Sequence, residues 1–257
     1  MYARSIAALF IVVLPFWITT AVEAVKPEDN RQIQGKGRHI YERACLWCHG
    51  ANGRGDGPDG WFIGRYEAPR PRNFVSEGFK LRSTPSGELP SDQDLFRTVT
   101  RGIPGVMPPF GSLTEEERWQ VIAYIKSFNP SFKENTPIPV MIPFPPIPLS
   151  DTSIEKGRAL YFQFGCQGCH GENGEGDDVT SRARELTDDR GLRILSTDLT
   201  RPSSFKNGSG HRDIFRTLMT GLDGTPMPSY AHNAEGREED LWHLVNYLLS
   251  LSGNSRP

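Results

Sequence analysis

The 257-residue chain lacks the features that mark several large classes of protein. It has no stripe of basic residues and a formal net charge of -2, which argues against nucleic-acid binding. No segment after residue 24 is apolar over the length that a bilayer span needs. Runs with the two-residue alternation of strands are also missing, whereas several segments have helical periodicity. We therefore expect an all-α fold, with long loops indicated by 26 glycines and 21 prolines.

Cysteine is scarce, and its placement is the main signal in the sequence. The four cysteines lie in two stretches, ACLWCHG and GCQGCHG, that place two thiols three positions apart with a histidine directly after the second: Cys45, Cys48 and His49, then Cys166, Cys169 and His170. Four cysteines in an exported protein are also compatible with two disulfides. The spacing and the following histidine favour a different use of these thiols.

The first 24 residues have the layout of a secretory signal. Arg4 is followed by an apolar run from Ile6 to Ile18 and by small residues that end at Ala24. We expect cleavage after Ala24 and a periplasmic or otherwise exported protein. The alternative is an uncleaved membrane anchor, which the short run and Pro15 disfavour. Contact with a membrane is expected only if this segment is retained.

The rest of the chain is an internal duplication. GRHIYERACLWCHG (37–50) corresponds to GRALYFQFGCQGCHG (157–171), DLFRTVTRG to DIFRTLMTG, and MPPF to MPSY. We therefore expect two copies of one domain, at residues 25–134 and 151–257. They are joined by a proline-rich linker at 135–150.

Each copy is expected to be a small helical domain. Thr114 and Glu117 form a capping box ahead of an apolar helix, and Gly102 and Gly221 are expected to stop two short helices. The linker is unusually apolar for an exposed segment, so we expect it to lie against one or both domains through Val140, Met141, Ile142, Phe144 and Ile147.

Three interpretations of the Cys-x-x-Cys-His motif compete. A redox dithiol would need a thioredoxin-like alternation of strands and helices, which is absent from the sequence pattern. A structural zinc ion needs four ligands, and each copy offers two thiols and one adjacent histidine. Covalent attachment of haem uses all three residues, since two thioethers hold one edge of the macrocycle and the histidine binds the iron. We predict haem on Cys45 and Cys48, and a second haem on Cys166 and Cys169.

The duplication also indicates which residue is the second axial ligand of each iron. His49 is paired with Met107 and His170 with Met227, because both methionines lie in the repeated Met-Pro element. The other methionines have other expected roles: Met141 lies in the linker, and Met219 fills a core. The other histidines lack a counterpart in the second copy, so solvated or hydrogen-bonded structural roles are expected for His39, His211, His232 and His243.

These motifs resemble tandem class I cytochrome c domains, from about Gly35 to Leu251. The resemblance implies an all-α fold in which a few helices surround each of two covalently bound haem c groups, with the first and last helices crossing near Gly37 and Gly157. It also implies that the carbonyl of Pro58 orients the first histidine, and it leaves the partner of His170 open. Three arginines of the first copy are either partners of the haem propionates or solvated loop charges: Arg70, Arg72 and Arg82.

Two functions remain as hypotheses, and a third is disfavoured. With histidine and methionine on each iron, the chain is expected to be an electron carrier rather than an enzyme, either free or as the cytochrome subunit of a larger oxidoreductase. Its expected partners are redox proteins, such as a periplasmic oxidoreductase or a membrane respiratory complex. The alternative is a dihaem enzyme of the peroxidase type, with one labile axial ligand. A haem-based sensor would need an output domain, which the sequence does not suggest.

Overall fold

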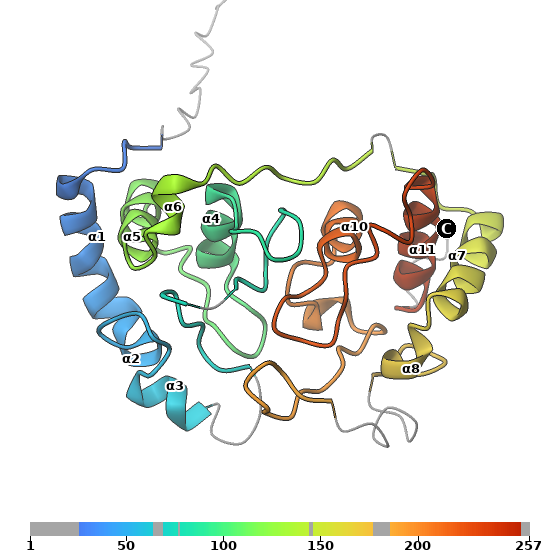
Figure 1. The fold of residues 1–257 in the computed structure, drawn as a ribbon. Coiled ribbons are helices and arrows are strands. Elements are labelled where there is room, and N and C mark those ends of the chain that lie inside the picture. Colours follow the sequence, from blue (N-terminus) through green and yellow to red (C-terminus); the bar gives the residue numbers. More distant parts are fainter. Residues whose placement is uncertain (1–25, 64–68, 77, 144–145, 177–185, 253–257) are drawn as a thin grey trace, which may run out of the picture.

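The computed structural model shows two helical halves that lie side by side (Figure 1). It describes residues 26–63, 69–76, 78–143, 146–176 and 186–252. Within these ranges there is no strand, and the extended pairing consists of two isolated bridges, Ile103 with Met107 and Thr187 with Arg193. The expected all-α fold is confirmed. The expected signal at residues 1–24 lies outside the described residues.

Each half contains a long first helix, a short helix that carries the motif, a middle helix and a last helix. In the first half these are α1 (Arg31–Ala44), α2 (Leu46–His49), α4 (Asp92–Arg101) and α5 (Glu115–Ser127), with α3 (Pro58–Ile63) and α6 (Ser131–Glu134) in addition. In the second half they are α7 (Asp151–Gln163), α8 (Gln167–His170), α10 (His211–Thr220) and α11 (Glu239–Ser250), with a 3-10 turn η1 (Pro202–Ser204). None of the described helices has both the length and the apolar character needed to cross a membrane.

Local sequence signals set the ends of these helices. Thr114 and Glu117 form the expected capping box at α5, and Ser91 forms another at α4. Helices α4 and α10 end at Gly102 and Gly221, whose φ angles of 67° and 63° lie in the region that only glycine adopts readily. The expected positions of both helix ends are therefore confirmed.

The first and last helices of each half cross at a glycine. A Cβ at Gly37 would overlap the main-chain carbonyl of Gln120 on α5, and one at Gly157 would overlap that of His243 on α11. The two crossings expected from the family resemblance are therefore present. Near each crossing a buried tyrosine hydroxyl donates to the carbonyl of the glycine that follows the motif, from Tyr41 over 2.7 Å and from Tyr161 over 2.6 Å.

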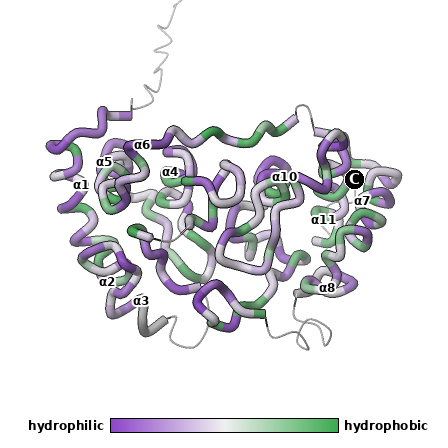
Figure 2. Tube along the Cα trace, in the orientation of Figure 1, coloured by the Kyte–Doolittle hydropathy of each residue, from purple (hydrophilic) through white to green (hydrophobic). Residues whose placement is uncertain are grey.

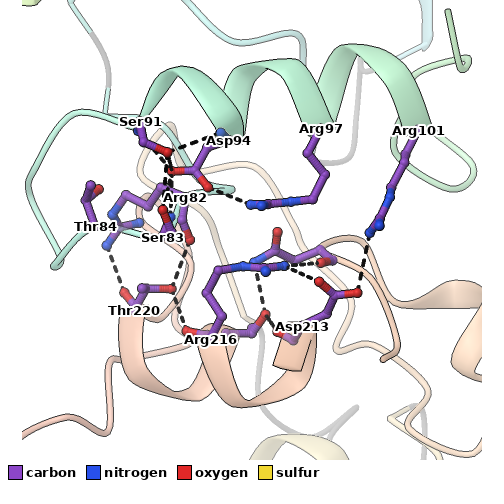
Figure 3. Close-up of polar contacts among 12 residues, drawn as sticks. Arg82, Ser83, Thr84, Ser91, Asp94, Arg97, Arg101, Asp213, Arg216 and Thr220 are labelled. Carbon is purple, nitrogen blue, oxygen red and sulfur yellow. Dashed lines mark hydrogen bonds and ion pairs between the residues drawn. The ribbon is translucent and has the colours of Figure 1, made fainter. Parts of the chain in front are cut away.

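Helices α4 and α10 face each other where the two halves meet (Figures 1 and 3). Arg82 is fully buried there, and its guanidinium donates to the Thr220 carbonyl over 2.8 Å and to the Asp223 carboxylate over 2.7 Å. Further along α4, Arg101 pairs with Asp213 over 3.4 Å. Both roles considered for Arg82, as a propionate partner or a solvated charge, are therefore wrong, because its donors are used to join the halves.

The linker runs across one side of both halves, with hydrophobic residues along its length (Figures 1 and 2). The main-chain N–H of Val140 donates to the Ser83 carbonyl over 2.7 Å, and the Asn246 amide donates to the Ile147 carbonyl over 3.1 Å. Ile142 and Ile147 pack against the core of the second half. The expected contact with the domains is confirmed for these residues. It is wrong for Met141, whose surface is 83% exposed, and Phe144 lies outside the described residues.

The crossing glycine gives a stability prediction with a matched control. Gly37→Ala forces α1 away from α5, so we expect the free energy of unfolding to fall by about 1 to 3 kcal/mol. Gly35→Ala lies on the exposed side of α1 with open space around its Cβ, and it is expected to raise that free energy by up to about 1 kcal/mol. Chemical denaturation of the two holoproteins measures both changes. Equal stability of the two variants would contradict the described crossing.

Candidate functional site

Each half contains a largely apolar cavity beside its cysteine motif. The first is lined by the four predicted residues of its half, Cys45, Cys48, His49 and Met107, and the second by Cys166, Cys169, His170 and Met227. Their volumes are about 1440 and 1110 Å³, counted with the open space at their mouths. The structure therefore brings the eight predicted site residues together as two matching groups of four.

Both motif histidines are oriented by a main-chain carbonyl. The Nδ1 atom of His49 lies 3.3 Å from the Arg72 carbonyl oxygen, and that of His170 lies 3.0 Å from the Thr197 carbonyl oxygen. Nδ1–H is then the donor, which leaves Nε2 as the nitrogen with a free lone pair. The expectation that Pro58 supplies the first carbonyl is wrong, and the open question about His170 is answered by Thr197.

The two carbonyls are held by the same backbone connection in each half. Two residues after each carbonyl, a main-chain N–H returns to a glycine just past the motif, from Phe74 to Gly53 over 2.7 Å and from Leu199 to Gly174 over 2.6 Å. Both glycines have positive φ angles, of 67° and 78°. The loop after the motif therefore fixes the loop that carries the acceptor.

Burial sets the protonation state of the motif residues. It lowers the pKa of His49 to about 4 and also lowers the pKa of His170, so both imidazoles are neutral near pH 7 and able to bind a metal ion. It raises the pKa of the Cys45 thiol to about 12 and that of the Cys166 thiol to about 11. Thiols with a raised pKa are poor candidates for disulfide exchange or zinc binding, both of which use the thiolate.

The remaining candidates for iron binding lie away from the cavities. Met219 packs against the core of the second half, as expected, and Met141 is exposed. His39 and His232 are exposed, and His243 is hydrogen-bonded to the Ser153 hydroxyl over 2.8 Å. Within the described ranges, no group of three or more histidine, cysteine, aspartate or glutamate side chains forms a metal site.

Both methionines lie in loops in which the methionine carbonyl accepts a main-chain hydrogen bond. Main-chain N–H groups donate to the methionine carbonyls, from Ile103 to Met107 over 2.8 Å and from Leu222 to Met227 over 3.1 Å. Each loop follows the glycine that ends the middle helix. The repeated Met-Pro element therefore places a methionine at each cavity, although the loop before it is one residue longer in the second half.

Sequence reasoning missed several residues around the cavities. Phe74 stacks on the ring of His49 with centroids 4.5 Å apart, and Leu199 takes the corresponding place in the second half. Lys80 and Lys206 line both cavities. The available signal was the dipeptide Phe-Lys, which occurs before the middle helix in both copies. Arg70 and Arg72 line the first cavity, so pairing with propionates remains a prediction for them.

Comparisons with known proteins agree with the geometry. The family model described as cytochrome C oxidase, cbb3-type, subunit III matches residues 34–125, and the cytochrome c model matches residues 154–252. No curated protein matches the chain. A chain in the solved structure of the Kuenenia stuttgartiensis reducing HAO-like protein complex Kustc0457/Kustc0458 is similar, with 37% sequence identity and a TM-score of 0.75. The similarity covers 84% of this chain and 95% of that one.

The two halves are thus c-type cytochrome domains, each with an apolar cavity, a buried neutral imidazole and two thiols at one edge. These features fit a haem held by thioether bonds. The chain belongs to the cytochrome c family, as a dihaem cytochrome c with two covalently bound haem c groups. Membership of this family supports electron transfer as its role.

Proposed function

We propose that this protein is an exported dihaem cytochrome that transfers electrons by the outer-sphere route between redox partners of a respiratory chain. In this proposal His49 and Met107 bind one iron, and His170 and Met227 bind the other. The observation that carries it is the presence of a histidine and a methionine in the lining of the same apolar cavity, in both halves.

The residues of the chain have distinct tasks in this function. Bound haem supplies an iron that changes its charge by one electron. The cysteines hold the macrocycle edge, and the carbonyls of Arg72 and Thr197 keep the two imidazoles in the orientation and tautomer that present Nε2. Methionine sulfur favours the reduced iron compared with a second imidazole, which suits a carrier that works at high potential.

Full axial ligation separates an electron carrier from an enzyme. A peroxidase needs an open position on one iron, and both cavities of this chain contain the methionine that would close it. In each methionine loop a main-chain N–H donates to the methionine carbonyl, which holds that residue at its cavity. We therefore favour two closed sites.

The similar solved chain belongs to a protein complex, and this chain covers 95% of its length. On that similarity we propose that this chain works as the cytochrome subunit of a larger oxidoreductase. The N-terminal segment, with Arg4 and the apolar run that follows it, supports export of the chain to the periplasm.

Replacement of one axial methionine tests the ligand assignment. Met107→His exchanges thioether for imidazole at the first iron, so we expect the midpoint potential of one haem to fall by an amount on the order of 0.1 V, within the range of about 0.8 V that axial ligands span. The second potential is expected to stay within error. Spectroelectrochemical titration of the holoprotein measures both values.

Met219→Leu is the matched control, because Met219 packs in the core of the second half. It is expected to leave both potentials unchanged. A response to Met219→Leu that equals the response to Met107→His would exclude Met107 as the ligand.

Exogenous ligands test whether both sites are closed. We expect the oxidised protein to show two low-spin haems that bind cyanide slowly, and the reduced protein to bind carbon monoxide slowly, because each ligand must displace methionine. Met107→Ala is expected to bind both ligands rapidly at one haem. Rapid binding by the unmodified protein would instead support the peroxidase alternative.

Purification from the native source tests the export and the partner. We expect the mature chain to begin just after Ala24 and to copurify with a larger redox protein. N-terminal sequencing and mass spectrometry of the purified material give both answers. A chain that retains residues 1–24 contradicts signal cleavage, and one recovered alone at low salt contradicts the subunit role.

A further inference from the structure

Two lysines at corresponding positions of the two halves lie in the wall shared by the haem cavities. Lys80 follows Phe79 in the first half, and Lys206 follows Phe205 in the second, so each is the lysine of the repeated Phe-Lys dipeptide. Both lysines line the first cavity, and both line the second. Each therefore reaches the haem site of the other half as well as that of its own.

The backbone that carries each lysine is fixed at the contact between the halves. Two residues after Lys80, the buried Arg82 donates to Thr220 and Asp223 of the second half. Directly after Lys206, Asn207 is buried, and its carbonyl accepts from Arg216 of α10 over 2.9 Å. Figure 3 shows Arg82 in contact with Thr220 across the halves, and Arg216 beside it within the second half. The two amines are therefore held near the cavities by anchored segments.

Neither amine is in direct contact with an acidic side chain within the part of the chain that the structure describes. No hydrogen bond or ion pair is formed by Lys80 or Lys206 there. Burial lowers the pKa of Lys80 to about 8; the charges of Arg72 and Lys206 lower it further, and those of Asp188 and Asp189 act in the opposite direction. Burial also lowers the pKa of Lys206. Two partly buried like charges are costly unless anions compensate them.

Haem itself brings anions that can contact the two amines directly. Haem c has two carboxylate groups, the propionates, on the side of the macrocycle away from its thioether bonds. The motif helices α2 and α8 lie toward the outer ends of the molecule, whereas the shared wall lies between the halves (Figure 1). A haem tethered at the outer edge of its cavity has its carboxylates on the side of the two lysines.

We propose that Lys80 and Lys206 form a cationic bridge that pairs with propionates of both haems, so that each lysine sets the midpoint potential of both. The inference rests on the proposed function only in requiring an iron of fixed ligation in each half. A positive charge near a haem disfavours the more positive ferric state and so raises the potential. Because each lysine lines both cavities, its charge acts on both irons.

Charge removal at one lysine tests the bridge. Lys80→Met and Lys206→Met each keep the length of the side chain and remove its charge. The matched controls are Lys133→Met on α6 and Lys156→Met on α7, which remove the same charge from exposed positions, one in each half. Every variant is titrated as the full holoprotein, and Met107→His assigns the two midpoint potentials to the two halves.

We expect both midpoint potentials to fall in both bridge variants, and to fall by more than in either control. Lys80→Arg keeps the charge and is expected to restore both values. A fall limited to the haem of the lysine's own half overturns the bridge, and so does a change no larger than in the controls. If Lys80→Met does not take up two haems, Lys206→Met and Lys80→Arg still decide the question.

Failure of this inference is distinguishable from failure of the proposed function. Unchanged potentials in variants that keep two low-spin haems overturn the bridge and leave the axial ligands as proposed. A high-spin haem in the unmodified protein overturns the axial ligands before any lysine is changed.

Discussion

The close crossing of the first and last helices is the constraint on which each haem site depends. Gly37 and Gly157 let the two backbones touch, and the tyrosine one turn later bonds to the carbonyl just past the motif. The position of the cysteines and histidine is therefore set by a helix contact that involves none of them. An added side chain at the crossing moves the motif relative to α5 or α11. Helix packing at this point therefore determines the position of the haem-binding residues.

The contact between the halves adds a second constraint, built from polar groups. Arg82 is fully buried, and it donates to Phe79 and Pro85 in its own half as well as to Thr220 and Asp223 across the contact. Loss of one partner of a buried ion pair costs about 3 to 5 kcal/mol, because the other charge remains without compensation. Such a contact is selective for one arrangement of the halves.

Features that depend on particular residue types could be predicted from the sequence. Contacts made by main-chain groups could not. Cys-x-x-Cys-His, the capping box of Thr114 and Glu117 and the helix-ending Gly102 are local patterns, and the structure contains the helices that they predict. The carbonyl of Arg72 left no such signal, because any residue supplies a carbonyl and the loop that presents it is tied to Gly53 by main-chain bonding. The role of Arg82 depends on Asp223, 141 residues away, which no local pattern indicates.

The two sites differ in the hydrogen bond of the motif histidine and in the polar residues that line the cavity. The hydrogen bond from His170 to its carbonyl is shorter than that from His49, at 3.0 against 3.3 Å. A stronger bond at Nδ1 gives the imidazole more anionic character and favours ferric iron. The first cavity is also lined by Arg70 and Arg72, of which Arg72 lies 3.9 Å from the Asp189 carboxylate, whereas Ser196 and Thr197 line the second. The two motif histidines therefore lie in surroundings that are not equivalent, although the duplication gives both the same backbone support.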